Sequence, residues 1–280
     1  MKLGELLEKL RTELQHITDS RELEAHIRIL IQHFFGLNRA EVQLNKDKEL
    51  NEDKLQQLQQ AVNELQAHRP LDYIIGESVF LGYPFYVNES VLIPRPETEE
   101  LVMLVAEHET ESDIAVLDIG TGSGCIPIGL ALEGDYREIE ACEVSEAALE
   151  VAQINVKKLN VKVKLFQLDI LQELPSRKYD VVVSNPPYVF QEELRGLEQH
   201  VKEYEPIIAL APNGEPLLFY KRMIAIAEQL LNTGGRFYWE IHEEMGEEVC
   251  ALFDNQAFKG VRLLQDMYGR DRFVTAIYTA

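Results

Sequence analysis

The 280-residue sequence has only three cysteines, Cys125, Cys142 and Cys250, and their spacing matches no metal site. We therefore expect neither a disulfide framework nor a metal centre, and the thiols are typical of buried side chains in a reducing compartment. No run of about 18 apolar residues is present, so no transmembrane helix is predicted. The first residues, MKLGELLEKLRTEL, carry acids where a signal peptide has an apolar segment. These absences predict a soluble cytoplasmic protein.

Positive charge is also scarce, because 27 lysines and arginines stand against 48 aspartates and glutamates, for a formal net charge of −21. Tight non-specific binding of nucleic acid depends on cations that neutralise the phosphate backbone. The composition therefore argues against a nucleic-acid partner, although a local basic groove is compatible with it. Hydrophobic residues make up 46% of the chain, which is enough for a sizeable core in one large or two modest domains.

Residues 1–69 predict a small helical domain, because their leucines and isoleucines recur at helical spacing. Asp19 and Glu22 have the spacing of a capping box at the start of a second helix, which Gly36 ends. A further helix is predicted from about Asn51. We expect this domain to bind a protein partner.

Residues 70–94 predict a β-hairpin linker around a Gly-Tyr-Pro turn, because β-forming residues flank that turn. From residue 95 to residue 280, strands and helices alternate, which is typical of an α/β fold with a doubly wound parallel sheet. The last of the predicted helices covers residues 215–235 and ends at a Gly-Gly pair. Two final strands joined by a tight loop imply one antiparallel strand within the sheet.

A glycine-rich loop, with Gly120, Gly122 and Gly124, follows a predicted strand and precedes a helix. Glycines are typical where the backbone approaches a ligand closely, and a helix N-terminus offers free N–H groups. The spacing G-x-G-x-G departs from the dinucleotide fingerprint, and a tight turn alone would also explain it. Glu143 ends the next strand, 19 residues beyond Gly124, where its carboxylate could accept both hydroxyls of a ribose. The combination favours a nucleoside cofactor.

Two more carboxylates, Asp118 and Asp169, are expected near this loop because each lies at the end of a predicted strand. They suit a cationic ligand with an amino group and suit a pyrophosphate badly. S-adenosylmethionine, which has a sulfonium and an ammonium group, is therefore favoured over NAD. For Asp118, capping of the loop is an equally simple explanation.

The stretch VVVSNPPY, residues 181–188, ends a buried strand on an asparagine, two prolines and a tyrosine. Proline fixes its own backbone and restricts the residue before it, so Asn185 and Pro186 are held rigidly. The Asn185 side-chain oxygen and the Pro186 carbonyl could then accept both hydrogens of a planar –NH2 group, while Tyr188 supplies a flat face or a hydroxyl. This arrangement would turn the nitrogen lone pair towards a methyl donor. An ordinary Asn-Pro turn is the alternative.

The tetrapeptide NPPY with DIGTGSG upstream resembles the amino-methyltransferases, and residues 69–102, which contain PRPETE, resemble the PrmC/HemK family. YEPIIAL at residues 204–210 and DMYGRDR at residues 266–272 are similar to family features as well. The resemblance implies a Rossmann-like seven-stranded methyltransferase sheet. It also implies methyl transfer from S-adenosyl-L-methionine to the glutamine side-chain amide in the Gly-Gly-Gln motif of class I peptide-chain release factors.

The resemblance further assigns roles to individual positions. Those that would bind the cofactor are Gly120, Thr121, Gly122, Ser123, Gly124, Glu143, Asp169, Ile170 and Asn185, with Asp169 and Ile170 near the adenine. Those that would bind the glutamine and carry the chemistry are Asn185, Pro186, Pro187 and Tyr188. Arg95, Pro96, Glu97 and Thr98 would close over the site, with Arg95 binding substrate. A helix N-cap is the alternative for that segment, because Thr98 precedes an apolar run with helical spacing.

Departures from the family pattern and two other functions remain open at this point. Pro127 and Pro216 lie where helix formers are expected, and Pro127 is expected in a first helical turn, where a proline is tolerated. His242 replaces a commoner glycine, and we assign it no catalytic role. One other function is methylation of an adenine or guanine amine in DNA or RNA, since the same tetrapeptide can hold a flipped base. The second is cofactor binding without catalysis, with the helical domain as an interaction module.

Overall fold

The computed structural model describes residues 1–17, 20–190, 192–253 and 257–280, which form two compact units. The first unit comprises Met1–Gly76 and Glu198–Tyr204, and the second comprises Glu77–Leu197 and Glu205–Ala280. Asp19 of the predicted capping box lies outside the described residues. The domain limits expected from the sequence, 1–69, 70–94 and 95–280, remain a proposal about how function is divided along the chain.

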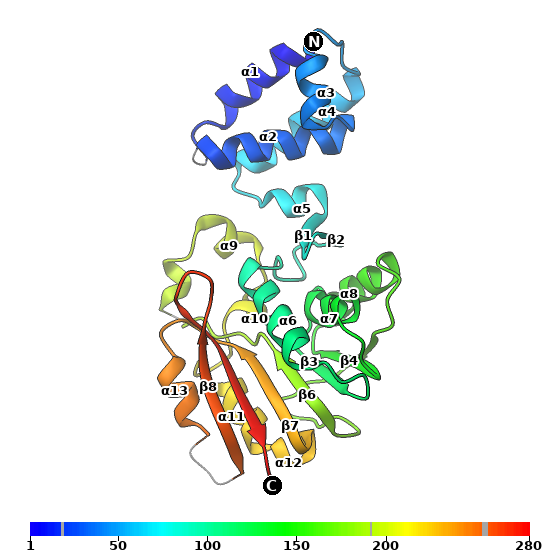
Figure 1. Cartoon of the computed structure of the whole chain (residues 1–280). Helices are drawn as coiled ribbons and strands as arrows, with labels where there is room; N and C mark the ends of the chain where they lie inside the picture. The colour runs from blue at the N-terminus through cyan, green and yellow to red at the C-terminus, as the bar shows by residue number, and fades with distance from the viewer. Residues whose placement is uncertain (18–19, 191, 254–256) are drawn as a thin grey trace. The chain divides into compact units, whose positions relative to one another are not determined.

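The first unit is helical (Figure 1). Its helices are α1 (Leu3–Leu14), α2 (Ser20–Phe35), α3 (Arg39–Leu44), α4 (Glu52–Gln66), α5 (Leu71–Ile75) and α9 (Gln199–Tyr204). The apolar stripes of α1, α2 and α4 form one buried cluster that includes Leu10, Leu30 and Leu58. As predicted, Gly36 follows the last residue of α2, with φ 67°, and a helix, α4, starts next to Asn51. The Asn51 side chain caps α4 by accepting from the Lys54 N–H. Burial in this shared core stabilises α1, α2 and α4.

The second unit contains the hairpin and an α/β sheet. Its strands are β1 (Glu77–Phe80), β2 (Tyr83–Tyr86), β3 (Ala115–Ile119), β4 (Glu138–Glu143), β5 (Lys164–Gln167), β6 (Tyr179–Ser184), β7 (Leu231–Glu240), β8 (Phe258–Gln265) and β9 (Asp271–Tyr278). Its helices are α6 (Pro96–His108), α7 (Cys125–Glu133), α8 (Glu146–Lys158), the short 3-10 helix η1 (Glu193–Arg195), α10 (Ile207–Leu210), α11 (Leu218–Ala225), α12 (Ala227–Leu230) and α13 (Gly246–Ala251).

The seven strands of the large sheet follow the order β5-β4-β3-β6-β7-β9-β8. All neighbouring pairs from β5 to β7 are parallel, and β9 is antiparallel to both β7 and β8. One antiparallel strand therefore lies within a sheet that is otherwise parallel. The predicted Rossmann-like fold class is confirmed, including its terminal antiparallel strand.

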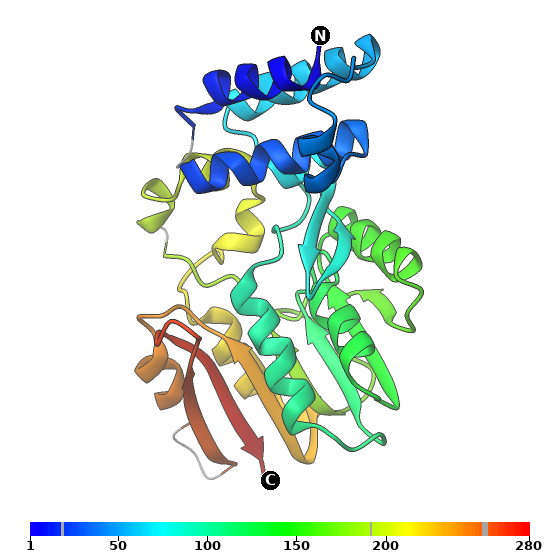
Figure 2. The same cartoon turned by 45° about the horizontal axis from the view of Figure 1, so that its top comes forward.

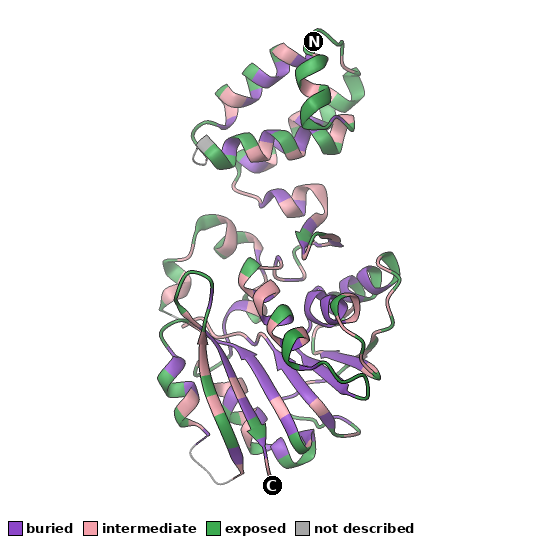
Figure 3. Ribbon diagram, viewed as in Figure 1, coloured by how far each residue is buried: buried purple, intermediate pink, exposed green. Residues whose placement is uncertain are grey.

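Helices cover both faces of this sheet (Figures 1 and 2). The period of two along a strand sends neighbouring side chains to opposite faces. In β3, Leu117 joins the core cluster that includes Tyr220 of α11, whereas Val116 joins the cluster that includes Val102 of α6. The central strands are consequently buried on both sides, as their colour in Figure 3 shows. In a sequence, strands buried on both faces are continuous runs of apolar residues, which is why VVV could be recognised as a buried strand.

Two details differ from the sequence-based expectation, and one agrees with it. The helix predicted over residues 215–235 ends at Leu230, because the chain joins the sheet as β7 from Leu231, and the Gly-Gly pair lies inside β7 beside a register shift. The hairpin turn is Leu81-Gly82, both with positive φ, whereas Tyr83 and Pro84 already pair with β1. Pro127 is confirmed as part of the first turn of α7, where a proline needs no N–H partner.

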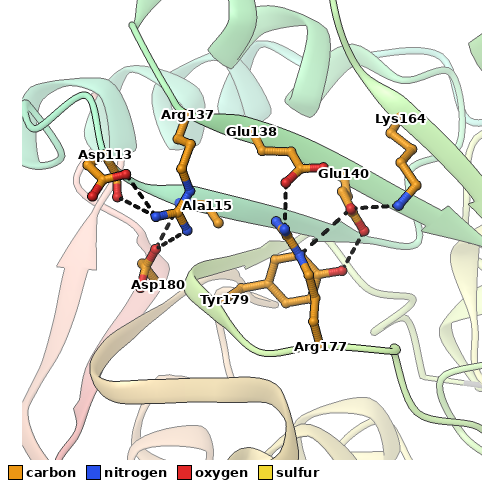
Figure 4. Close-up of polar contacts among 9 residues, drawn as sticks. All are labelled: Asp113, Ala115, Arg137, Glu138, Glu140, Lys164, Arg177, Tyr179 and Asp180. Carbon is orange, nitrogen blue, oxygen red and sulfur yellow. Dashed lines mark hydrogen bonds and ion pairs between the residues drawn. The ribbon is translucent and has the colours of Figure 1, made fainter.

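Ion pairs occupy the amino ends of the parallel strands (Figure 4). The Tyr179 hydroxyl donates to Oε2 of buried Glu140 at 2.6 Å, and Nζ of Lys164 lies 2.8 Å from Oε1 of the same carboxylate. Arg177 pairs with Glu138 alongside. These charges compensate one another across β4, β5 and β6, so the charged residues at this edge of the sheet are explained by their role in the fold. A ligand site is expected at the opposite, carboxyl edge.

Within the described parts of the chain, no helix is both long and apolar enough to cross a membrane. The same residues contain no cluster of three or more histidine, cysteine or acidic side chains arranged to hold a metal ion.

Candidate active site

A cavity of about 240 Å³ lies at the carboxyl ends of the parallel strands. Four of its lining segments each follow one strand: Gly120–Ser123 after β3, Glu143–Ser145 at the end of β4, Leu168–Leu171 after β5, and Asn185–Pro187 after β6. These segments contain most of the positions for which the sequence predicted a ligand. Of the other predicted positions, Arg95 and Thr98 line the cavity from a different segment. Pro96, Glu97, Gly124 and Tyr188 do not line it.

The glycine loop adopts a conformation that only glycine accepts easily. Gly120, Gly122 and Gly124 have φ values of 75°, 52° and 81°, all in the left-handed region. A Cβ at Gly124 would also meet Ile128 at 3.1 Å and Ala152 at 3.3 Å, so this position needs glycine for space as well. The loop therefore enters α7 by a tight turn that leaves backbone facing the cavity.

Glu143 fixes this loop to the end of β4. Its Oε2 accepts a hydrogen bond from the Gly122 N–H at 3.0 Å, and its Oε1 accepts from the N–H groups of Val144 and Ser145 at 2.9 and 3.0 Å. A carboxylate has about four acceptor positions, so these three bonds leave about one for a ligand. A ribose diol that binds both hydroxyls to Glu143 would have to displace one of the backbone donors.

Asp118 lies beneath the loop at the end of β3 and is completely buried. Burial raises the pKa of its carboxyl group to about 7, and the nearby Thr121 hydroxyl opposes this rise in part. Neither carboxylate oxygen makes a hydrogen bond of standard geometry to any described residue. The simple explanation of Asp118 as a loop cap is therefore not supported by a hydrogen bond.

We expect Asp118→Asn to stabilise the protein at about pH 8 and to have a smaller effect at about pH 5. The folded-state pKa of about 7 exceeds the ordinary 3.8, so the folded protein keeps a proton that the unfolded chain has lost. The contribution of Asp118 to the free energy of unfolding is thus highest below the ordinary pKa and falls as the pH rises towards 7. The difference between the two pH values should be on the order of 3 kcal/mol. Urea unfolding at both pH values measures it, and an equal effect at both would contradict the expectation.

Asp169 and Ile170 lie at the cavity beyond β5, as the sequence predicted. The Asp169 carboxylate is already bonded, accepting from the Leu171 N–H at 3.0 Å and from the Gln172 side chain at 2.6 Å. Ile170 is buried, and its carbonyl accepts from Arg222 at 2.8 Å. This wall of the cavity thus offers an apolar side chain beside a carboxylate held in one orientation.

Asn185 and Pro186 line both the main cavity and a second, adjoining cavity of about 80 Å³, which Tyr188 also lines. Nδ2 of Asn185 donates to the Thr98 hydroxyl at 3.1 Å. Within the described part of the chain, neither the Asn185 side-chain oxygen nor the Pro186 carbonyl accepts a hydrogen bond. Two rigid acceptors therefore remain available where the two cavities meet.

Glu240 is the principal residue of this site that sequence reasoning missed. It ends β7, is 1% exposed, and accepts from Thr98 Oγ1 at 2.7 Å and from the Tyr188 hydroxyl at 3.1 Å. The Tyr188 hydroxyl is therefore engaged, and the aromatic face is the part of this side chain left for a ligand. A charged residue at the end of an apolar strand, in FYWEIH, was the signal available in the sequence.

The segment PRPETE begins α6, with Pro96 at its first position and Arg95 as the N-cap residue. The alternative that this segment is a helix N-cap agrees with the structure, with Arg95 as the N-cap residue. Thr98 itself lies inside the first turn, where its N–H donates to the Arg95 carbonyl at 3.1 Å. Arg95 lines both cavities, and its Nη2 donates to both oxygens of buried Glu205, at 2.6 and 2.8 Å. This pair holds the guanidinium at the cavity wall.

Two more side chains support the site from outside. Asn155, buried on α8, donates to the carbonyls of Ser123 and Tyr86 at 2.8 and 2.9 Å and accepts from the Tyr86 N–H, so it ties the glycine loop to the hairpin. Its signal in the sequence was a polar residue on an apolar helix face. His242 packs edge-on against the rings of Tyr188 and Phe190, at 6.0 and 5.5 Å between centroids.

Comparison with known proteins agrees with this architecture. The family model described as "Methyltransferase small domain" matches residues 100–215, and the one described as "PrmC N-terminal domain" matches residues 5–76. A methyltransferase from Pyrococcus furiosus has a similar fold, with a TM-score of 0.52 and 16% identity over 82% of this chain and 100% of that one.

Relatives of nearly the same length share much more of the sequence. The release factor glutamine methyltransferase of Flavobacterium psychrophilum is 38% identical over 279 residues, which cover 96% of this chain and 98% of that protein. The protein of the same name from Bacillus subtilis is 34% identical, with 97% of each chain covered. The predicted PrmC/HemK resemblance is thereby confirmed. The chain belongs to the release factor glutamine methyltransferase family.

Proposed function

We propose that the protein transfers a methyl group from S-adenosyl-L-methionine to the side-chain amide nitrogen of the glutamine in the Gly-Gly-Gln motif of class I peptide-chain release factors. Two of the relatives carry the name of this activity. The observation that carries the proposal to this chain is the pair of available acceptors, the Asn185 side-chain oxygen and the Pro186 carbonyl, where two cavities meet. A cytoplasmic location is part of the proposal.

The main cavity fits this cofactor in its chemistry. Its glycine loop presents backbone without side chains, and its acidic lining residues Glu143 and Asp169 suit a ligand with a sulfonium and an ammonium group. Gly120–Ser123 and Glu143 would hold the nucleoside and amino acid parts, and Ile170 would contact the adenine. When bound, S-adenosylmethionine supplies the methyl group.

The residues of the chain then act on the glutamine amide. The nitrogen of an amide is a poor nucleophile because its lone pair is delocalised into the carbonyl group. Acceptance of both N–H hydrogens, by Asn185 and by Pro186, favours a more pyramidal nitrogen whose lone pair faces the methyl donor. Orientation of this kind can contribute up to ~7–11 kcal/mol to a reaction. The Tyr188 ring, held through its hydroxyl by Glu240, would bound the amide on one side.

Methyl-labelled S-adenosylmethionine tests the proposal directly. We expect the label on the glutamine of the Gly-Gly-Gln motif when the protein is incubated with an unmethylated release factor and the product is mapped by mass spectrometry. A release factor with alanine in place of that glutamine should remain unlabelled. Label on DNA or RNA added to the same mixture would instead support the amino-group methyltransferase of nucleic acids, and no transfer at all would support a binding protein without catalysis.

A further inference from the structure

Three side chains from distant parts of the sequence form a chain of hydrogen bonds that ends at the proposed substrate clamp. Thr98 Oγ1 donates to Glu240 Oε2 at 2.7 Å, and Asn185 Nδ2 donates to the same Thr98 oxygen at 3.1 Å. Thr98 and Glu240 are 2% and 1% exposed. Asn185 follows β6 and Glu240 ends the neighbouring β7, with Ser184 paired to Trp239, so the sheet register brings the two ends together.

The direction of these bonds follows from the chemistry of the carboxylate. An ionised carboxylate only accepts hydrogen bonds, whereas a hydroxyl has one proton to donate and lone pairs to accept. When Glu240 is ionised, the single Thr98 proton goes to Glu240, and Thr98 can only accept from Asn185. The Asn185 amide must therefore direct its –NH2 towards Thr98, and its oxygen is left for the cavity.

We propose that Glu240 is a positioning residue that acts through Thr98 to hold the Asn185 side-chain oxygen towards the substrate amide. This inference rests on the proposed function, because a glutamine –NH2 is the group that requires an acceptor there. Glu240 also accepts from the Tyr188 hydroxyl at 3.1 Å. One buried carboxylate thus sets the orientation of two of the four NPPY residues.

The proposal implies that catalysis depends on the charge of Glu240. Burial raises the pKa of this carboxyl group to about 7, and hydrogen bonds from Thr98 and Tyr188 lower it by less. The other titratable or charged groups around it are Arg272 on β9, which favours the charge, and Glu97 on α6, which opposes it. Cys125 on α7 is affected by its charge, and Tyr220 on α11 donates to its backbone carbonyl at 2.8 Å.

Protonation of Glu240 would reverse the direction of the hydrogen bonds between Glu240 and Thr98 and between Thr98 and Asn185. The protonated carboxyl can donate to Thr98, whose own proton is then free to bond the Asn185 oxygen. The amide would turn over and present its –NH2 to the –NH2 of the substrate, two donors facing each other. We therefore expect kcat for release factor methylation to fall as the pH decreases through about 7, with the slope of a single proton.

Three variants and two controls test this with the full chain, labelled cofactor and unmethylated release factor. Thr98→Val should lower kcat by about 10- to 100-fold, because the Asn185 amide loses its partner. Thr98→Ser keeps the hydroxyl and should restore kcat to within about threefold of the parent. Glu240→Gln cannot ionise, so its kcat should lose the decline near pH 7. Thr110→Val and Glu107→Gln, both exposed on the surface, are the matched controls.

The outcomes separate this inference from the proposed function. If the parent protein labels no release factor, the proposed function fails, and this inference fails with it. If the parent is active but Thr98→Val keeps its kcat, or Glu240→Gln keeps the decline near pH 7, the positioning role alone is overturned. Cofactor affinity and melting temperature of each variant show whether it is folded. Should Glu240→Gln not fold, the kcat values of Thr98→Val and Thr98→Ser still show whether the Thr98 hydroxyl positions Asn185.

Discussion

Asn185→Ala should lower kcat for methyl transfer by about 10³-fold, while the affinity for S-adenosylmethionine is at least partly retained. The variant removes one of the two acceptors proposed to hold the glutamine –NH2, and loss of one such preorganised group costs ~10²–10³-fold or more. The proposed cofactor contacts are unchanged in this variant, because the glycine loop follows β3 and Glu143 ends β4, whereas Asn185 follows β6.

Single-turnover kinetics with saturating cofactor and release factor measure this effect, and isothermal titration calorimetry measures cofactor binding. Gln153→Ala removes an exposed amide from α8 and should change neither quantity by more than about twofold. The melting temperature of Asn185→Ala should stay close to that of the parent. A variant that is folded, binds cofactor and transfers methyl at the parental rate would refute the clamp.

Glu143→Ala should weaken cofactor binding by about 100-fold. The carboxylate accepts from three backbone N–H groups, those of Gly122, Val144 and Ser145, and lines the main cavity. Its removal takes away both the proposed ribose acceptor and the contact that holds the glycine loop against β4. Hydrogen bonds to charged groups contribute ~1.5–3 kcal/mol each, so the loss of one or two accounts for this magnitude.

Calorimetric titration with S-adenosylmethionine measures the change, and Glu146→Ala, an exposed glutamate three residues further along, is its control. Glu143→Gln keeps one acceptor oxygen and should give an intermediate affinity. Because the proposed amide clamp lies on β6, kcat at saturating cofactor should fall by much less than the affinity does. Parental affinity in Glu143→Ala would show that the ribose lies elsewhere.

Much of the site could be predicted because its local geometry is imposed by the residues themselves. Only glycine accepts the left-handed conformation readily, so the triplet at 120, 122 and 124 indicated a tight loop between a strand and a helix. The prolines after Asn185 restrict the backbone of the residues next to them, so the end of β6 could also be predicted from the sequence. The prediction was wrong at the end of the helix before β7. The Gly-Gly pair indicated that the helix ends there, but β7 already begins at Leu231 and contains both glycines.

Residues that act across the fold could not be found in this way. Glu240 meets Thr98 over a separation of 142 positions, and Asn155 meets Tyr86 over 69. Which strand ends become neighbours depends on the strand order, and no local pattern encodes that order. The sequence determined the loop conformation, the rigid NPPY backbone and the class of fold, because each depends on short-range sterics and periodicity. Only the tertiary structure decided that the buried Glu240 carboxylate accepts from Thr98, which in turn accepts from Asn185, because these contacts exist only once β6 and β7 are paired and α6 brings Thr98 to their ends.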